Sequence, residues 1–474
     1  MEKLKQEEVG EEPVSPTGQY FNSSVLSVSV LAVLEILVPI DDSQTMSLLK
    51  DLFLPINPRF SSVMVRDKNG VKHWKSVQVN LRDHVHVPIF PAGLTPESYD
   101  EYLDDYLTKI AQEQLPQSRP LWEIHIIKYP TRSAKGHVLF KLHHAMGDGF
   151  SLMGALLSCL QRADNPSLPL NFPVLRMGFD SDDKEGFLKR VPRVISGFFN
   201  SVWDFGWSIL KSSVMEDDRT PIRSGDDGVE FRPITITTLT FSLDQLKLIK
   251  SSLKVTINDV ITGIIFLGTR LYMKETGHKF GTSNSTALVL MNTRNIAGYK
   301  SVEEMVKPNK DTKWGNQFGF LHVSVPELRE EADESSNPID FVFQAQETIQ
   351  RKRNSLAVPL TGKLLDTMRK YRGPEVTAHY IHSTLKNSSM TISNMIGPVE
   401  QLALDNHPCA GMYFMVVGVP QSLTITMVSY MGKLRVAVGT EKGHVDSSKY
   451  KSCIQKAFEM IFRVAVKSSP GELA

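Results

Sequence analysis

The clearest hydrophobic pattern of the chain lies between residues 136 and 162. An apolar run from Val138 to Leu142, bounded by Gly136, is typical of a buried strand. From Phe150 to Leu160 the apolar residues recur at the three- and four-residue spacing of a helix. The sequence therefore predicts a strand, a tight turn and a helix. The turn holds two histidines, an aspartate and two glycines.

Similar patterns predict further elements along both halves of the chain. Residues 95–115 read as an amphipathic helix, and a strand from Leu121 to Ile127 follows Pro120. In the second half we expect a helix over Leu243–Leu253 and a hairpin with its bend at residues 431–433. The apolar run from Tyr20 to Asp42 is interrupted by serines and Glu35, which favours a core strand over a membrane span.

Two segments are expected to lie outside the packed cores. Residues 1–18 are acidic and contain two prolines, Pro13 and Pro16, which predicts a disordered tail. Residues 166–230 read as a linker that contains a basic amphipathic segment at about 187–215, with Trp and Phe on its apolar positions. This composition suits a helix that lies in a membrane interface. A tilted membrane span and a helix folded onto the protein's own core stay open as alternatives.

Composition and charge exclude several classes of function. Of the 474 residues, 41% are hydrophobic and 22% charged, as in a folded globular protein. A net charge of +1 gives no electrostatic reason to bind nucleic acid. The three cysteines lie far apart, which predicts neither a disulfide framework nor a metal site. His84 and His86 would share one face of a half-buried strand over residues 73–90, and we interpret them as residues that pack or line a substrate channel, because no third metal ligand can be named.

The turn at residues 143–149 contains the groups needed for general-base chemistry. Histidine titrates near neutrality and is the usual general base, so His143 and His144 are the candidates. Asp148 can fix the turn or orient a ring, and Gly149 allows a close approach that a side chain would block.

The string HHAMGDG resembles the H-H-x-x-x-D-G signature of the CoA-dependent acyltransferases. Four further segments are similar to motifs of one branch, the plant-type wax ester synthase/diacylglycerol acyltransferases, and they occur in that family's order. They are Pro120-Leu121-Trp122, Asn258-Asp259, the W-G-N string from Trp314, and S-N-M-I-G-P from Ser393 to Pro398. DFGW at residues 204–207 is similar to a box of the BAHD acyltransferases, but it lies too close to His144 and ends in Ser208, so we treat it as coincidence.

The resemblance implies an α/β fold of two chloramphenicol-acetyltransferase-like domains, with mixed sheets flanked by helices and a substrate tunnel between them. The domains would span residues 19–165 and 231–474. It also implies that a fatty acyl group passes from acyl-CoA to a long-chain alcohol, or to diacylglycerol. No metal or cofactor would be needed, since acyl-CoA is a substrate.

The resemblance also gives each site residue an expected role. His144 would be the general base, His143 would line the site, and Asp148 would hold the loop, with Arg294 as its candidate partner. Substrate or oxyanion contacts are expected from a polar group of four residues: Asn258, Asp259, Ser393 and Asn394. Pro120, Leu121 and Trp122 would shape the acyl pocket.

The expected partners are acyl-CoA, the lipid acceptor and a membrane surface, at the cytosolic face of the endoplasmic reticulum or also at the cell membrane. Two alternatives remain open at this point. One is a BAHD-like acyltransferase that acts on soluble alcohols or amines, and the other is a catalytically silent lipid-binding protein of the same fold.

Overall fold

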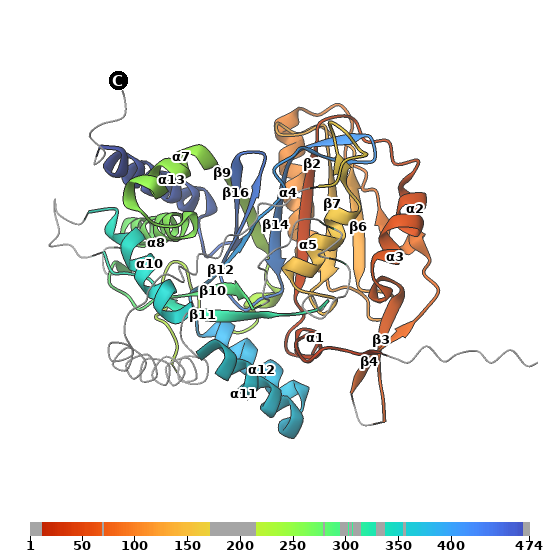
Figure 1. Cartoon of the computed structure of the whole chain (residues 1–474), viewed down its shortest axis with the longest axis horizontal. Coiled ribbons are helices and arrows are strands. Elements are labelled where there is room, and N and C mark those ends of the chain that lie inside the picture. Colours follow the sequence, from red (N-terminus) through yellow and green to blue (C-terminus); the bar gives the residue numbers. More distant parts are fainter. Residues whose placement is uncertain are drawn as a thin grey trace, which may run out of the picture.

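The computed structural model describes residues 12–68, 71–170, 215–277, 280–293, 302, 306, 314–328, 337–353 and 357–467. Its two large sheets are both mixed, and helices flank them, which confirms the predicted α/β class. Figure 1 shows the two halves side by side, with the early part of the chain in red to yellow and most of the later part in green to blue. The segment at 187–214 and Arg294 lie outside the described residues.

The first sheet has seven strands in the order β5-β6-β7-β2-β14-β13-β8. Their bounds are Val85–His86, Trp122–Ile127, Gly136–His143, Ser29–Ile36, His407–Val417, Leu402–Leu404 and Gln161–Arg162. All eight residues of β2 and all eight of β7 are buried, because helices cover both faces of the sheet. The predicted core strand within residues 20–42 is thereby confirmed.

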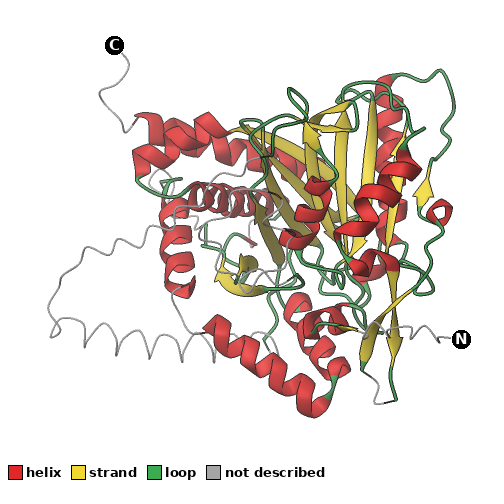
Figure 2. Cartoon of the chain, turned by 45° about the vertical axis from the view of Figure 1, so that its right-hand side comes forward, coloured by secondary structure: helices red, strands yellow, loops and turns green. Residues whose placement is uncertain are grey.

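Two helices pack on opposite faces of this sheet (Figure 2). Helix α4 (Pro96–Gln112) packs against Leu31 and Val33, whereas α5 (Gly149–Ser158) packs against Val30 and Ala32. This follows from the two-residue period of a strand. A short helical segment also lies on the α5 face. It comprises α2 (Thr45–Leu48), a π-helical turn (Leu49–Phe53) and α3 (Leu54–Ile56).

The second sheet has six strands in the order β11-β10-β12-β15-β16-β9. Their bounds are Phe318–Ser324, Thr286–Asn292, Met390–Met395, Leu423–Tyr430, Lys433–Glu441 and Ile234–Ser242. The predicted hairpin is β15–β16, where Met431 and Gly432 both have positive φ, as a tight two-residue turn requires.

Within the described residues, six helices accompany the second sheet. The four that share its largest core are α7 (Leu243–Leu253), α8 (Ile257–Thr276), α10 (Asp340–Arg353) and α13 (Ser447–Lys467). The other two are α11 (Ala357–Arg372) and α12 (Pro374–Lys386). Among the described residues no single helix has both the length and the apolar composition of a membrane span; α7 and α8 reach these only as a pair bent by 99°.

The division of the chain at residue 231 does not match the sheets. β14 follows β12 in the second half of the chain, yet it pairs with β2 in the first sheet. Residues 215–230, which we assigned to the linker, pack into the second half. There the Asp217 carboxylate accepts hydrogen bonds from the Thr286 backbone N–H at 2.6 Å and the Ser389 hydroxyl at 2.7 Å. Sequence composition cannot show such long-range pairing.

The predicted tail of residues 1–18 is wrong for its last part. From residue 12 the chain forms β1 (Glu12–Pro13), which pairs with β4 (Lys72–Ser76), and then α1 (Pro16–Phe21). Strand β3 (Ser62–Arg66) completes this small third sheet. Val14 is buried, and Gly18 approaches the turn so closely that an added Cβ would lie 3.0 Å from the Ala145 carbonyl oxygen.

The long strand predicted over residues 73–90 is also wrong. β4 ends at Ser76, a 3₁₀ turn covers Leu81–Asp83, and β5 has only two residues. His84 packs flat on Trp122, with ring centroids 4.1 Å apart, and its Nδ1 donates to the Trp122 carbonyl oxygen at 2.7 Å. The packing interpretation of His84 is confirmed.

Candidate active site

The turn between β7 and α5 sends its two histidines to opposite sides of the first sheet. His143 is the last residue of β7 and points to the α4 face, because strand side chains alternate. His144 continues the pairing through its N–H, which donates to the Val28 carbonyl oxygen at 2.8 Å, and its ring points to the α5 face. The two rings therefore meet different surroundings.

One amide side chain from the second half of the chain holds His144. The Asn316 Nδ2 donates to the His144 carbonyl oxygen at 2.9 Å, and the Asn316 Oδ1 lies 2.9 Å from the His144 Nδ1. A carbonyl oxygen only accepts hydrogen bonds, so the amide orientation is determined, and Oδ1 must accept from a protonated Nδ1. Neutral His144 therefore carries its lone pair on Nε2.

Burial keeps the His144 ring neutral. Loss of hydration lowers the pKa of His144 below its usual 6.5, and this effect outweighs the Asp148 carboxylate, which acts in the opposite direction. The ring also contacts Phe21 and Phe318, at centroid distances of 4.8 and 5.5 Å. An uncharged imidazole with a free lone pair is the form that a general base requires.

His143 has the opposite arrangement and does not line the cavity beside His144, contrary to expectation. The Ala145 N–H donates to its Nδ1 at 3.1 Å, so its proton is on Nε2, which donates to the Ser27 hydroxyl at 3.2 Å. Burial lowers the pKa of His143 to about 3. Both nitrogens are used within the fold, so His143 serves the loop and is not available to a substrate.

Asp148 caps α5 and ties the turn to the second half of the chain. Its Oδ1 accepts from the Ser151 N–H at 3.0 Å, and its Oδ2 accepts from the Gln317 N–H at 2.8 Å. Next to it, the Met146 carbonyl oxygen accepts from the Trp314 Nε1 at 2.8 Å. These contacts place Asn316 against His144, which agrees with the predicted loop-holding role of Asp148. Its candidate partner, Arg294, lies outside the described residues.

A mainly apolar cavity of about 250 Å³ lies beside His144, between the two halves. Its first wall comes from β2, β7, β14 and α5, and its second from β10, Phe318 and the end of β12. Polar groups line it near His144 and at the end of β12, including Asp148, Gln317, Ser393 and Asn394. Such a cavity suits a long hydrocarbon chain with one reactive polar end.

Two predicted motifs meet at the second wall of the cavity. Asn394 lines the cavity, and its Nδ2 donates to the Asn258 Oδ1 at 3.2 Å. Ser393 and Asn394 belong to β12. Thr256 is the N-cap of α8, and Asp259 completes the capping box by accepting a hydrogen bond from the Thr256 N–H.

The Pro120-Leu121-Trp122 segment supports the turn at residues 143–149 but does not line the cavity. The Leu121 carbonyl oxygen accepts from the His143 N–H at 3.0 Å, and the buried Trp122 donates through Nε1 to the Phe60 carbonyl oxygen at 2.9 Å. Pro120 and Leu121 are buried as well. The predicted pocket-shaping role thus becomes a supporting one, because β6 aligns β7 from the side.

Gly149 does line the cavity. A Cβ added there would lie 3.0 Å from the Met395 Sδ on the opposite wall, which is tighter than most real contacts. A glycine at the first position of α5 therefore lets the two halves approach each other beside His144.

The sequence prediction missed Asn316, Gln317, Phe21 and Phe318. The W-G-N string from Trp314 was noted as a motif, but no role was given to Asn316, which lies 172 residues from His144. Phe21 was placed in a core segment without a link to the turn. Among the described residues no group of three or more His, Cys, Asp or Glu side chains could hold a metal ion.

Comparisons with known proteins agree with this geometry. A model of the wax ester synthase/diacylglycerol acyltransferase catalytic domain matches residues 51–261, and a model of the WS/DGAT C-terminal domain matches residues 314–462. Wax ester synthase/diacylglycerol acyltransferase 4 of Arabidopsis thaliana is 30% identical over 90% of this chain and 85% of its own length. Wax ester synthase/diacylglycerol acyltransferase 11 of the same plant is 27% identical over 95% of this chain and 94% of its own length.

Solved structures share the fold. The wax ester synthase/diacylglycerol acyltransferase from Marinobacter aquaeolei VT8 superposes with a TM-score of 0.58 at 16% identity, over 96% of this chain and all of its own. The starter condensation domain of rhizomide synthetase, solved with C8-CoA and Leu-SNAC, has a TM-score of 0.55 at 11% identity, over 96% and 94% of the chains. The predicted two-domain fold is thereby confirmed. With its two matching family models and its relatives along nearly the whole sequence, the chain belongs to the wax ester synthase/diacylglycerol acyltransferase family and is an acyltransferase.

Proposed function

We propose that this protein transfers a fatty acyl group from acyl-CoA to the hydroxyl of a long-chain alcohol, with diacylglycerol as a second acceptor, and that His144 is the general base. The observation that carries the proposal is the pair of hydrogen bonds between Asn316 and His144, which leaves the basic nitrogen Nε2 on the ring that lines the cavity. Family membership supports acyl-CoA and a lipid hydroxyl as the substrates.

The reaction needs one proton transfer in each direction. His144 Nε2 takes the proton of the acceptor hydroxyl as its oxygen attacks the thioester carbonyl carbon. The tetrahedral intermediate then collapses, the carbon–sulfur bond breaks, and the imidazolium returns the proton to the leaving thiolate of CoA. General-base help of this kind typically contributes 10²–10⁴-fold to the rate.

Asn316 supports this cycle at both stages. Its Oδ1 accepts from the Nδ1–H of the neutral ring, and the same hydrogen bond stabilises the imidazolium that forms after proton transfer. Ser393 and Asn394 line the same cavity and are the proposed donors to the oxyanion. A water-poor cavity strengthens these interactions.

The BAHD-like and silent-protein alternatives differ from this proposal in a measurable way. Purified protein is incubated with palmitoyl-CoA and with hexadecanol, diacylglycerol or a phenolic alcohol, and both free CoA thiol and ester product are measured. The proposal expects thiol release with hexadecanol or diacylglycerol. Thiol release with the phenolic acceptor alone would support the BAHD-like acyltransferase in place of the proposed function. Binding of acyl-CoA without thiol release would support the catalytically silent lipid-binding protein.

Association with a membrane of the endoplasmic reticulum remains part of the proposal through residues 187–215. Fractionation of cells that express the full chain, against a chain in which the aromatic residues of this segment are replaced by serine, measures it. Recovery of both proteins in the soluble fraction would remove this part of the proposal.

A further inference from the structure

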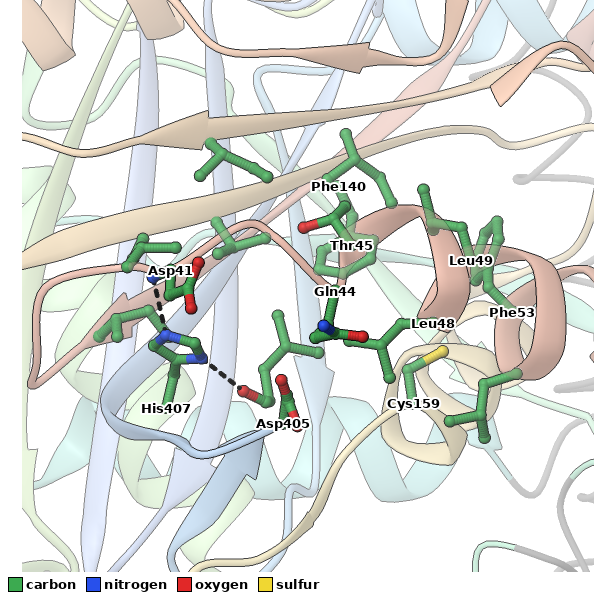
Figure 3. A pocket seen from close by; sticks show the side chains of 17 residues that line it. Asp41, Gln44, Thr45, Leu48, Leu49, Phe53, Phe140, Cys159, Asp405 and His407 are labelled. Atoms are coloured by element: carbon green, nitrogen blue, oxygen red, sulfur yellow. Dashed lines mark hydrogen bonds between the residues drawn. The ribbon is translucent and has the colours of Figure 1, made fainter. Parts of the chain in front are cut away.

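A second apolar cavity lies on the α5 face of the first sheet, beyond the cavity at His144. It measures about 50 Å³ and lies between the sheet and the α2 segment, with Cys159 after the end of α5 at one side. Figure 3 shows Leu49, Phe53 and Cys159 at one end, and Asp41, Asp405 and His407 grouped at the other. The two aspartates and His407 thus lie together at one end, whereas most of the lining is apolar.

The two cavities are consecutive along one face. Val30 and Ala32 of β2 line the first, and Ile36 lines the second; even-numbered residues of β2 share this face. On β7, Leu142 lines the first cavity and Phe140 the second. From Val30 to Ile36 the strand spans about 20 Å, at roughly 3.3 Å per residue.

Phe140 stands at the junction of the cavities. It pairs directly across the sheet with Ala32, so one pair of neighbouring residues contributes a small side chain to the first cavity and a large ring to the second. The next pair, Leu34 and Val138, is buried on the same face. A phenyl ring beside an alanine fills the space through which a chain would pass between the cavities.

We propose that the second cavity receives the far end of a long hydrocarbon chain whose reactive end lies at His144, and that Phe140 sets how long that chain can be. The inference rests on the proposed function, since it needs a chain bound at His144. The small volume of the second cavity suits the end of a chain better than a whole lipid. Two acidic side chains, Asp41 and Asp405, line this cavity and disfavour a carboxylate or phosphate there, so the end that arrives is the uncharged one.

Turnover of chains of increasing length tests the proposal. The kcat/KM is measured for octanoyl- to eicosanoyl-CoA with one alcohol, and separately for octanol to eicosanol with one acyl-CoA. Phe140→Ala should raise the ratio of long-chain to short-chain kcat/KM by about tenfold or more in one of the two series, since one methylene in an apolar pocket changes discrimination about 10–200-fold. The series in which this ratio changes identifies the substrate, acyl-CoA or alcohol, whose chain enters the second cavity.

A blocking variant and a control make the result independent of folding losses. Cys159→Phe fills the second cavity from the end of α5 and should lower the same ratio. Phe140→Leu replaces the alanine variant if that one does not fold. Phe266→Leu, in the buried core of the second half and lining neither cavity, should leave the ratio unchanged. Equal length profiles for the wild type, both Phe140 variants and Cys159→Phe would overturn the inference.

Thiol labelling supplies a readout without turnover. Cys159 is partly exposed, whereas Cys409 and Cys453, the other two cysteines of the chain, are buried. Long-chain but not octanoyl ligands should slow the labelling of Cys159 by a small uncharged reagent. Protection that is equal for short and long ligands would contradict the inference. If no acyl-CoA releases free CoA in the turnover assay, that result would instead contradict the proposed function.

Discussion

His143 and His144 are neighbours in sequence, and the fold gives them opposite protonation patterns. His143 accepts at Nδ1 from the Ala145 N–H and donates from Nε2 to Ser27, so both of its nitrogens are used. His144 donates from Nδ1 to Asn316 and keeps its Nε2 lone pair beside the cavity. The comparison shows that the role of each ring depends on the partner of its Nδ1.

Replacing His144 should give the largest effect on this comparison. His144→Ala removes the proposed base, and we expect turnover to fall by about 10²–10⁴-fold, measured by release of CoA thiol. The melting temperature should change little, because the main-chain contacts of residue 144 remain. Full turnover in a folded His144→Ala protein would contradict the assignment of the base.

Replacing Asn316 tests whether the tautomer matters. Asn316→Leu removes both hydrogen bonds to residue 144, and kcat should fall by about 10–10²-fold, the range typical of losing the partner that orients a metal-binding histidine. Wild-type kcat with this variant would show that the ring is oriented by other contacts.

The pH profile sharpens the same point. Because burial lowers the pKa of His144, the wild-type kcat/KM should fall only at pH values below 6.5. Asn316→Asp places a carboxylate beside Nδ1, which favours the imidazolium, so the acid limb should move to higher pH. An unchanged acid limb would mean that residue 316 does not contact the titrating group.

Asp148→Asn should mainly reduce stability. The asparagine oxygen can still cap α5, but it does not also satisfy the Gln317 N–H, and we expect a loss of about 1–3 kcal/mol in the free energy of unfolding. Denaturant titration measures this loss. A midpoint equal to that of the wild type would contradict the tethering role, and His144→Ala serves as the control that leaves the tether in place.

His143→Asn should have the smallest effect on turnover per folded molecule, less than about tenfold, since His143 does not line the cavity. Its effect should appear in stability. The pKa of His143 is about 3 in the fold and about 6.5 when unfolded, so wild-type stability declines as the pH falls from 6.5 toward 3. The variant should lose less stability over this range. Equal acid sensitivity of the two proteins would contradict this contribution of His143.

The local part of the site could be predicted from the sequence. The apolar run before residue 143 and the helical spacing after residue 149 correctly placed β7 and α5, and the cap formed by Asp148 follows from a residue type that caps helices. The roles that depend on distant residues could not be predicted. Asn316 reaches His144 from another half of the molecule, and Glu12 to Phe21, assigned largely to a tail, closes one side of the turn.

His143 and Trp122 illustrate the same limit. Motif similarity identified both as site residues, yet burial and hydrogen bonds place them behind the turn. A motif marks a residue that the site requires, but only the packing of neighbouring strands shows whether the residue faces the substrate or supports a residue that does.

The most direct test is the tautomer of each histidine in the folded protein. Nitrogen-15 NMR of histidine-labelled protein at neutral pH reports which ring nitrogen carries the proton, and the His143→Asn and His144→Ala variants assign the two resonance pairs among the 13 histidines. The account predicts a protonated Nδ1 for His144 and a protonated Nε2 for His143. A protonated Nε2 on His144 would contradict it, because that ring would then have no lone pair to offer the substrate.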